Sequence, residues 1–157
     1  MRPGNSPLIE RVMAVVERHK PLEGPLLPIL HGLQDEFGYV PVEALPLIAE
    51  ALNISRAEVH GVFTFYHDFR HQPAGRHILK LCQAEACQAM GSDHIRYQLE
   101  SELGIGLKQT ARDNSVTFEP VYCLGLCACA PAAMLDGEMI GRIDAKRVAE
   151  IIQAVRS

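Results

Sequence analysis

Four of the chain's five cysteines form two close pairs, and these pairs constrain the fold more than any other feature. They are Cys82-x4-Cys87 and Cys123-x3-Cys127, with 35 residues between the pairs. A fold that brings both loops together presents four thiolates around one small volume. A [2Fe–2S] cluster requires four thiolates, two on each iron. Both loops are longer than the C-x2-C of common zinc ribbons, so the spacing favours iron–sulfur over zinc.

Other interpretations of the cysteines stay open at this point. A zinc site uses the same ligands, and buried free cysteines are common small hydrophobic residues. Thiol redox chemistry typically needs a C-x-x-C pair, and neither pair has that spacing. The fifth cysteine, Cys129, lies two residues beyond Cys127, and we expect it to support the site by packing rather than to be a ligand.

Composition and charge exclude several classes of function. With 157 residues, 48% hydrophobic and 22% charged, the chain has the composition of a soluble globular protein of one domain or two small ones. Its net charge of −4 argues against nucleic-acid binding. We find no signal sequence and no stretch that would insert directly into a membrane, so we expect a cytoplasmic protein. In that reducing compartment clustered cysteines are metal ligands or redox thiols rather than disulfides.

The first part of the chain has the apolar spacing of α-helices. The strongest local signal is the capping box Ser55-Arg56-Ala57-Glu58, which predicts a helix start. Gly38 suits the position that follows a helix, and residues 67–76, with Pro73 and Gly75, indicate a linker. These features predict a helical domain over residues 1–72, and we expect it to be a docking domain because it carries no chemistry of its own. Its helices are expected after Ser6 and over residues 26–37, 43–52 and 56–66.

After the linker the apolar period changes to that of strands. Residues 77–81 alternate and end at Cys82, while a second strand over 116–122 ends near Cys123, with Pro120 indicating an edge or a kink. Asp136-Gly137 is a hairpin signal. Two further helices are expected, one capped by Ser92 and stopped by Gly104 and one capped by Asp144. The fold class is therefore α+β, with a β-α-β-β-α domain over residues 73–157 that follows the helical bundle.

No other group of residues carries a recognisable chemistry. His67 and His71 have helix spacing but lie in the expected linker without an acidic partner, so we do not expect a metal there. The sequence contains no Walker loop, no G-x-S-x-G and no H-E-x-x-H. We therefore expect a chain without a catalytic site of its own.

The cysteine motif resembles that of a known family. Cys-x4-Cys, followed by Cys-Leu-Gly-x-Cys and then Ala130-Pro131, resembles the thioredoxin-like [2Fe–2S] subunit of NADH dehydrogenases. Residues 27–30, 37–41 and 62–66 resemble the helical domain of the same family. The run SRAEVHGVFTFYHDFR, residues 55–70, is most similar to the gamma subunit of soluble, molybdenum-containing, NAD-dependent formate dehydrogenases.

The resemblance implies a cofactor, ligands and partners. The family's ligands fall on Cys82, Cys87, Cys123 and Cys127, which would hold one [2Fe–2S] cluster in a thioredoxin-like domain. The expected role is a non-catalytic electron-transfer subunit whose partner flavoprotein binds FMN and NAD. In a formate dehydrogenase a further subunit would carry the molybdopterin cofactor and more clusters. The alternatives are the equivalent subunit of an NAD-reducing hydrogenase or of respiratory complex I.

Overall fold

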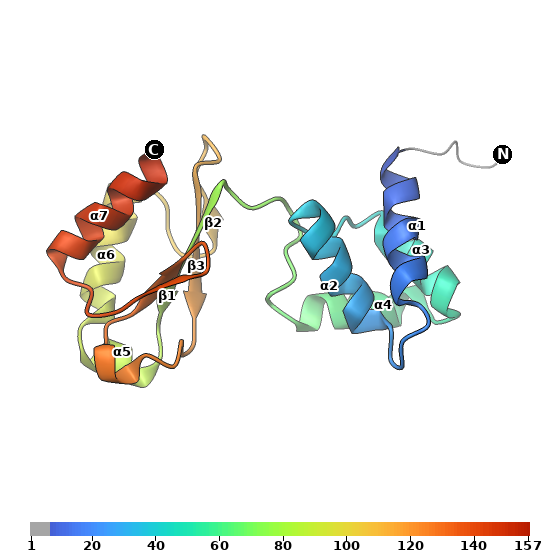
Figure 1. Cartoon of the computed structure of the whole chain (residues 1–157), viewed down its shortest axis with the longest axis horizontal. Helices are drawn as coiled ribbons and strands as arrows, with labels where there is room; N and C mark the ends of the chain where they lie inside the picture. The colour runs from blue at the N-terminus through green and yellow to red at the C-terminus, as the bar shows by residue number, and fades with distance from the viewer. Residues whose placement is uncertain (1–6) are drawn as a thin grey trace. The chain divides into compact units, whose positions relative to one another are not determined.

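The computed structural model describes residues 7–157 and divides the chain into two compact units, Met1–Pro73 and Ala74–Ser157 (Figure 1). Ser6, after which the first helix is predicted to begin, lies outside the described residues. The first unit is helical, and the second contains the sheet. No helix in the described part of the chain combines the length and the apolar character needed to cross a bilayer.

Four helices build the first unit around their apolar faces. Residues three or four apart on each helix are buried, because this spacing places them on one side. The core also includes Val40, which follows the second helix. The helices are α1 (Pro7–His19), α2 (Leu26–Phe37), α3 (Ala44–Leu52) and α4 (Arg56–Phe65).

Local signals fix where these helices begin and end. The backbone N–H of Glu58 donates to Ser55 Oγ at 3.1 Å, and Glu58 Oε2 accepts from the Ser55 N–H at 2.8 Å, which confirms the capping box. Helix α2 ends at Gly38, whose φ of +78° is left-handed, as predicted. Asn53 ends α3 in the same conformation with a φ of +53°.

The segment after α4 is packed rather than a free linker along its whole length. Phe69 is buried in the helical core with 3% of its surface exposed. The Gln34 side chain donates to the Asp68 carbonyl at 2.9 Å and accepts from the Arg70 N–H at 2.7 Å. The prediction of a linker from residue 67 was therefore wrong at its start, because burial of an aromatic ring holds this part against α2.

The second unit is built on a mixed five-stranded sheet of order β2-β3-β1-β4-β5 (Figure 1). Strands β1 and β3 are parallel, and the other neighbours are antiparallel. The hairpin at Asp136-Gly137 is confirmed, and Pro120 lies beyond the residues of β3 that pair with β2. The strands are β1 (His77–Cys82), β2 (Gln109–Thr110), β3 (Val116–Val121), β4 (Ala133–Leu135) and β5 (Glu138–Ile140).

Helices α6 (Ser92–Leu103) and α7 (Ala145–Arg156) pack against the sheet, and their apolar residues share one core with β1 and β3. This arrangement confirms the predicted α+β, thioredoxin-like class. Two elements were not expected: the two-residue β2 and the short α5 (Glu85–Ala89) between the first two cysteines. The predicted cap at Ser92 was wrong, because Gly91 precedes α6 and the Ser92 hydroxyl makes no cap bond.

Candidate metal centre

The parallel pairing of β1 with β3 brings the two cysteine loops to one edge of the sheet. Cys82 is the last residue of β1 and lies opposite Val121, the last residue of β3. Cys123 follows two residues later. The carboxyl ends of neighbouring parallel strands meet at the same edge, so the two loops leave the sheet side by side.

The first pair of cysteines is buried. Cys82 and Cys87, from β1 and α5, are each 2% exposed, and they share a small apolar cluster with Ala132. Burial alone would raise the pKa of the Cys82 thiol. Hydrogen bonds from the Ala84 N–H, from the Cys87 thiol and from the backbone of the second loop outweigh burial and lower that pKa. These hydrogen bonds stabilise the thiolate form of Cys82.

The partner thiol shows the opposite shift. Burial raises the pKa of Cys87, and the neighbouring Cys82 raises it further through its hydrogen bond and its charge. Two neighbouring thiols resist losing both protons, because the two thiolates would repel each other, unless a cation lies between them. A cation between the two sulfurs would relieve this repulsion.

The second pair is exposed and held by its own loop. The sulfurs of Cys123 and Cys127 lie 3.7 Å apart, and the Gly125 N–H donates to Cys123 Sγ at 3.4 Å. Gly125 has a φ of +79°, a left-handed conformation that glycine adopts without strain, so it permits the turn of this loop. Cys123 itself has a φ of +84°, a strained value for a residue with a side chain. The pKa of Cys127 is raised by its hydrogen bond with Cys123 and by that thiol's charge.

The donor set fits a two-iron cluster. A tetrahedral metal with bonds of about 2.3 Å to sulfur holds two thiolates about 3.8 Å apart. The separation of 3.7 Å between Cys123 and Cys127 matches such a pair. Backbone groups of Cys123 and Leu124 help to lower the pKa of Cys82, so the second loop lies against the first pair. In the part of the chain that the structure describes, no three His, Cys, Asp or Glu side chains surround a single-ion position.

Cys129 occupies a packing position beside the site. It is half-buried and ends a short 3-10 helix, Cys127–Cys129. Its carbonyl accepts from the Arg142 N–H at 2.6 Å, and a Cβ added to Gly141 would lie 2.9 Å from the Cys129 Cβ. The absence of a side chain at Gly141 therefore leaves room for Cys129. Through its carbonyl, Cys129 binds the second cysteine loop to the segment after β5.

The structure places one of the two linker histidines against the helical core. His71 is exposed, and its ring packs on the buried Phe63 with 4.2 Å between ring centroids. Two polar residues beside the cysteines were not expected from the sequence. Gln83 and Ser92 are buried next to Cys82, and only the fold of β1 and α6 brings them together. Neither residue has a pattern in the sequence that would have identified it.

Comparison with known proteins agrees with this geometry. The sequence profile of the family "Thioredoxin-like [2Fe-2S] ferredoxin" matches residues 12–156. A subunit of the NADH-quinone oxidoreductase of Pseudomonas aeruginosa is 40% identical over 122 residues, which cover 78% of this chain and 74% of that protein. The HndA subunit of the NADP-reducing hydrogenase of Solidesulfovibrio fructosivorans is 30% identical over 146 residues, 93% of this chain and 85% of that one.

A solved structure shares the fold. The crystal structure of an NAD+-reducing [NiFe]-hydrogenase in the air-oxidized state superposes with a TM-score of 0.62 at 22% identity. The match covers 92% of this chain and 22% of the hydrogenase chain, so this protein spans about a fifth of that polypeptide. The cofactor implied by the four thiols, one [2Fe–2S] cluster, is also the one that the matched family carries. From its cysteine loops and from the match over most of its length, the chain belongs to the thioredoxin-like [2Fe–2S] ferredoxin family.

Proposed function

We propose that the chain is an electron-transfer subunit that exchanges single electrons with the FMN of a partner flavoprotein that binds NAD. The carrying observation is the convergence of two thiol pairs at one sheet edge, with one pair exposed. We assign Cys82, Cys87, Cys123 and Cys127 as the cluster ligands. We also propose that the protein works in the cytoplasm and makes no direct contact with nucleic acid or membrane.

The residues of the chain hold and tune the cluster. When bound, a [2Fe–2S] cluster accepts or gives one electron at a time. Cys82 and Cys87 would hold one iron from the buried side, and Cys123 and Cys127 would hold the other from the exposed loop. The N–H of Gly125 donates to one ligand sulfur, and such bonds adjust the reduction potential. The exposed pair gives a partner's cofactor a short path to the cluster.

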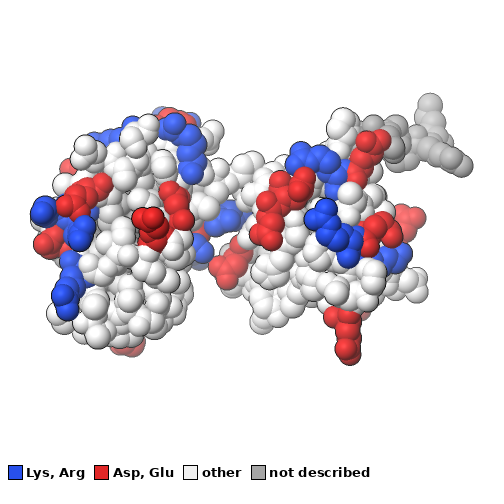
Figure 2. Space-filling model, viewed as in Figure 1, with Lys and Arg blue, Asp and Glu red and all other residues white. Residues whose placement is uncertain are grey.

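The surface around the cysteines suits contact with a protein. Residues 120–135 contain no charged side chain, and residues 81–91 contain only Glu85. Tyr122 is 73% exposed and Met90 63% exposed. Figure 2 shows few charged side chains at the end of this unit where α5 lies, whereas both signs are interspersed elsewhere on the visible face. Exposed aromatic residues on a charge-poor surface are typical of protein interfaces.

The helical unit offers a second contact surface. Phe65 and Tyr66, at the end of α4, are 72% and 44% exposed and stack edge to face with 5.1 Å between centroids. No chemistry of its own is apparent in this unit among residues 7–73. We therefore propose that residues 1–72 form a docking domain and residues 73–157 the cluster domain.

The parent complex is proposed from the resemblance of residues 55–70 to formate dehydrogenase gamma subunits. In that complex a molybdopterin-containing catalytic subunit would be the third partner. The names of the relatives favour an alternative, the equivalent subunit of an NADH-quinone oxidoreductase or of a hydrogenase. Mass spectrometry of the complex purified with this chain separates the two, because only the first contains a molybdopterin subunit.

The cofactor assignment has a direct test. Protein purified without oxygen should be red-brown, with iron and acid-labile sulfide in equal amounts, and dithionite should bleach it. The reduced protein should give one spin-half EPR signal. Zinc without labile sulfide in fresh preparations would contradict the assignment.

The partner assignment needs a second experiment. NADH should reduce the cluster rapidly in the complex with the flavoprotein and hardly at all in the isolated chain. The comparison is informative because dithionite reduces the cluster in both samples. Equal reduction by NADH in the isolated chain would contradict the proposal, because it would place a nicotinamide site on this polypeptide.

A further inference from the structure

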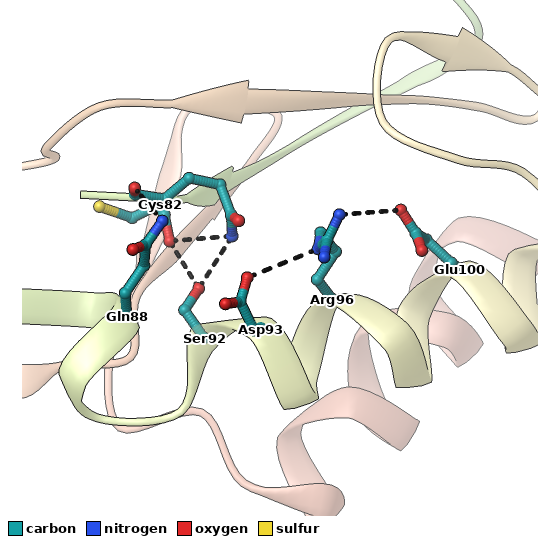
Figure 3. A network of polar contacts seen from close by, with 7 residues as sticks. Cys82, Gln88, Ser92, Asp93, Arg96 and Glu100 are labelled. Atoms are coloured by element: carbon teal, nitrogen blue, oxygen red, sulfur yellow. Dashed lines mark hydrogen bonds and ion pairs between the residues drawn. The ribbon is translucent and has the colours of Figure 1, made fainter. Parts of the chain in front are cut away.

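A buried polar network holds the end of β1, where the first cysteine lies (Figure 3). Ser92, the first residue of α6, has no exposed surface, and its hydroxyl donates to the Cys82 carbonyl at 2.6 Å. The Gln83 side chain is 8% exposed and donates through Nε2 to Ser92 Oγ at 3.0 Å. The same Nε2 lies 3.3 Å from the Cys82 carbonyl. Two side-chain donors therefore converge on one backbone oxygen.

The rest of the Cys82–Gln83 backbone is paired as well. The Cys82 N–H donates to the Ala132 carbonyl at 3.0 Å, and the Gln83 N–H donates to the Val121 carbonyl at 2.8 Å. The Gln83 carbonyl accepts from Gln88 Nε2 at 3.0 Å. Every N–H and C=O of these two residues thus has a partner, so the peptide between them has one fixed orientation.

The position of the Ser92 hydroxyl is informative because a serine at a helix start usually caps the helix. Here α6 starts after Gly91 with no side-chain cap, and the hydroxyl bonds to a cysteine carbonyl instead. A buried carbonyl that loses its donor is costly, so this bond is not a neutral surface contact. The network therefore connects α6 to the cysteine loop rather than to its own helix.

The fixed peptide is joined directly to the peptide that carries the next backbone donor. The N–H of Ala84, two residues after Cys82, faces the Cys82 thiol and is one of the backbone groups that lower its pKa. Hydrogen bonds to a ligand sulfur stabilise the more negative, reduced cluster and so raise its reduction potential. The Ala84 N–H belongs to the Gln83–Ala84 peptide, whose carbonyl accepts from Gln88 Nε2. That peptide follows directly on the Cys82–Gln83 peptide, which Ser92 and Gln83 hold through the Cys82 carbonyl.

We propose that Ser92, supported by Gln83, is a positioning residue that holds the Cys82 loop so that a backbone N–H reaches the ligand sulfur and raises the cluster potential. The inference rests on the proposed function, in which Cys82 is a ligand. Ser92 does not touch the sulfur; it acts through the Cys82 carbonyl.

The test compares two serine-to-alanine variants of the full chain loaded with its cluster. Ser92→Ala removes the network hydroxyl. Ser115→Ala is the matched control, because Ser115 is 9% exposed, donates to Asp113 at 2.7 Å and precedes β3 at the strand end away from the cysteines. Potentiometric titration followed by EPR gives the midpoint potential and the g values of each protein, and thermal unfolding gives their stability.

Ser92→Ala should disfavour reduction of the cluster at least threefold. For a one-electron couple, at 59 mV per tenfold, this change makes the midpoint potential about 28 mV more negative. Its g values should also change. Ser115→Ala should lower stability and leave the potential and the g values unchanged. A merely structural role for Ser92 predicts lower stability in both variants and wild-type potentials in both.

A second variant keeps the test decisive if Ser92→Ala fails to hold a cluster. Gln83→Met removes the amide that supports Ser92 but leaves the bond from Ser92 to Cys82, and it should shift the potential in the same direction by less. Wild-type potentials and g values in every variant that holds a cluster would overturn the inference while the cluster assignment stands. A wild-type chain without a [2Fe–2S] spectrum would instead overturn the proposed function.

Discussion

The four thiols differ in their surroundings although they are chemically identical. Cys82 and Cys87 are buried among apolar residues, whereas Cys123 and Cys127 are exposed and depend on a loop with two left-handed residues. Cys129 is close in sequence but is engaged in packing against Gly141. The exposed fraction of a thiol therefore does not distinguish the four proposed ligands from Cys129, and substitution is needed to do so.

Replacing any of Cys82, Cys87, Cys123 or Cys127 by alanine should abolish the cluster or make it too unstable to purify. Each change removes one of the two thiolates that an iron requires from the protein. Cys129→Ala is the control and should retain the visible spectrum. The ligand assignment fails if Cys129→Ala loses the spectrum while one of the other four variants keeps it. Iron content and absorbance of anaerobic preparations measure the outcome.

Gly125→Ala should destabilise the holoprotein by about 1 kcal/mol and accelerate cluster loss, because a side chain disfavours the left-handed backbone. A Cβ at this position would meet no atom within 4 Å, so the cost is conformational rather than steric. Gly106→Ala is the matched control, since its nearest contact would be an ordinary 3.8 Å. Equal stability and equal rates of cluster bleaching in the two variants would contradict this prediction, because they would show that an alanine side chain does not strain the turn at position 125.

At the level of elements, α4 depends on a cap that involves a carboxylate. Hydrogen bonds from the Ser55 hydroxyl and N–H lower the pKa of Glu58. A carboxyl group whose pKa is lower in the folded state adds stability above its unfolded pKa and loses that contribution as the pH falls through the folded value. The capping box is therefore a part of the helical unit that weakens in acid.

Ser55→Ala should cost about 1 kcal/mol at neutral pH, the usual value for loss of a helix cap. Glu58→Gln should reduce the acid dependence of unfolding below about pH 4.5, the region in which carboxyl groups titrate. Glu50→Gln, an exposed change of the same kind at the end of α3, serves as the control. Denaturant unfolding between pH 3 and 7 measures all three variants, and identical pH profiles for the two glutamate variants would contradict the role of the cap.

Elements with local signals could be predicted, and elements defined by tertiary contacts could not. Ser55 and Glu58 signal a helix start by themselves, and Asp136-Gly137 signals a hairpin. The short α5 and β2 have too few residues to show a period. Ser92 has the sequence of a cap, yet the Cys82 carbonyl, brought near by the fold, takes its hydroxyl. At the site, the spacing of the cysteines in the sequence indicated the two pairs. The N–H donors around Cys82 could not be predicted, because they come from contacts between loops.

The whole molecule consists of two units that each bury their own core. The core of residues 74–157 is formed by residues of the sheet, α6 and α7, and the apolar cluster beside the cysteines also lies within this unit. Residues 12–69 form a separate core in the helical unit. Independent cores are the usual basis of independent folding.

A fragment that begins at Ala74 should therefore fold and assemble the cluster with the absorption and EPR spectra of the full chain. It should bind the flavoprotein partner more weakly, because it lacks the proposed docking domain. Reconstitution of the apo fragment with iron and sulfide, followed by EPR, is the measurement. A folded fragment that takes up no cluster would show that the helical unit completes the site.

The register of β1 against β3 has a consequence for how the protein matures. Cys82 faces Val121 across the parallel pair, and this places Cys123 beside the first loop. A slip of one residue would move one strand by about 3.3 Å and turn its side chains to the opposite face, which would separate the two halves of the site. Misregistered chains would offer only scattered thiols and would remain colourless. Cluster uptake should therefore be confined to chains with the correct strand pairing, and the fraction of coloured protein should report that population.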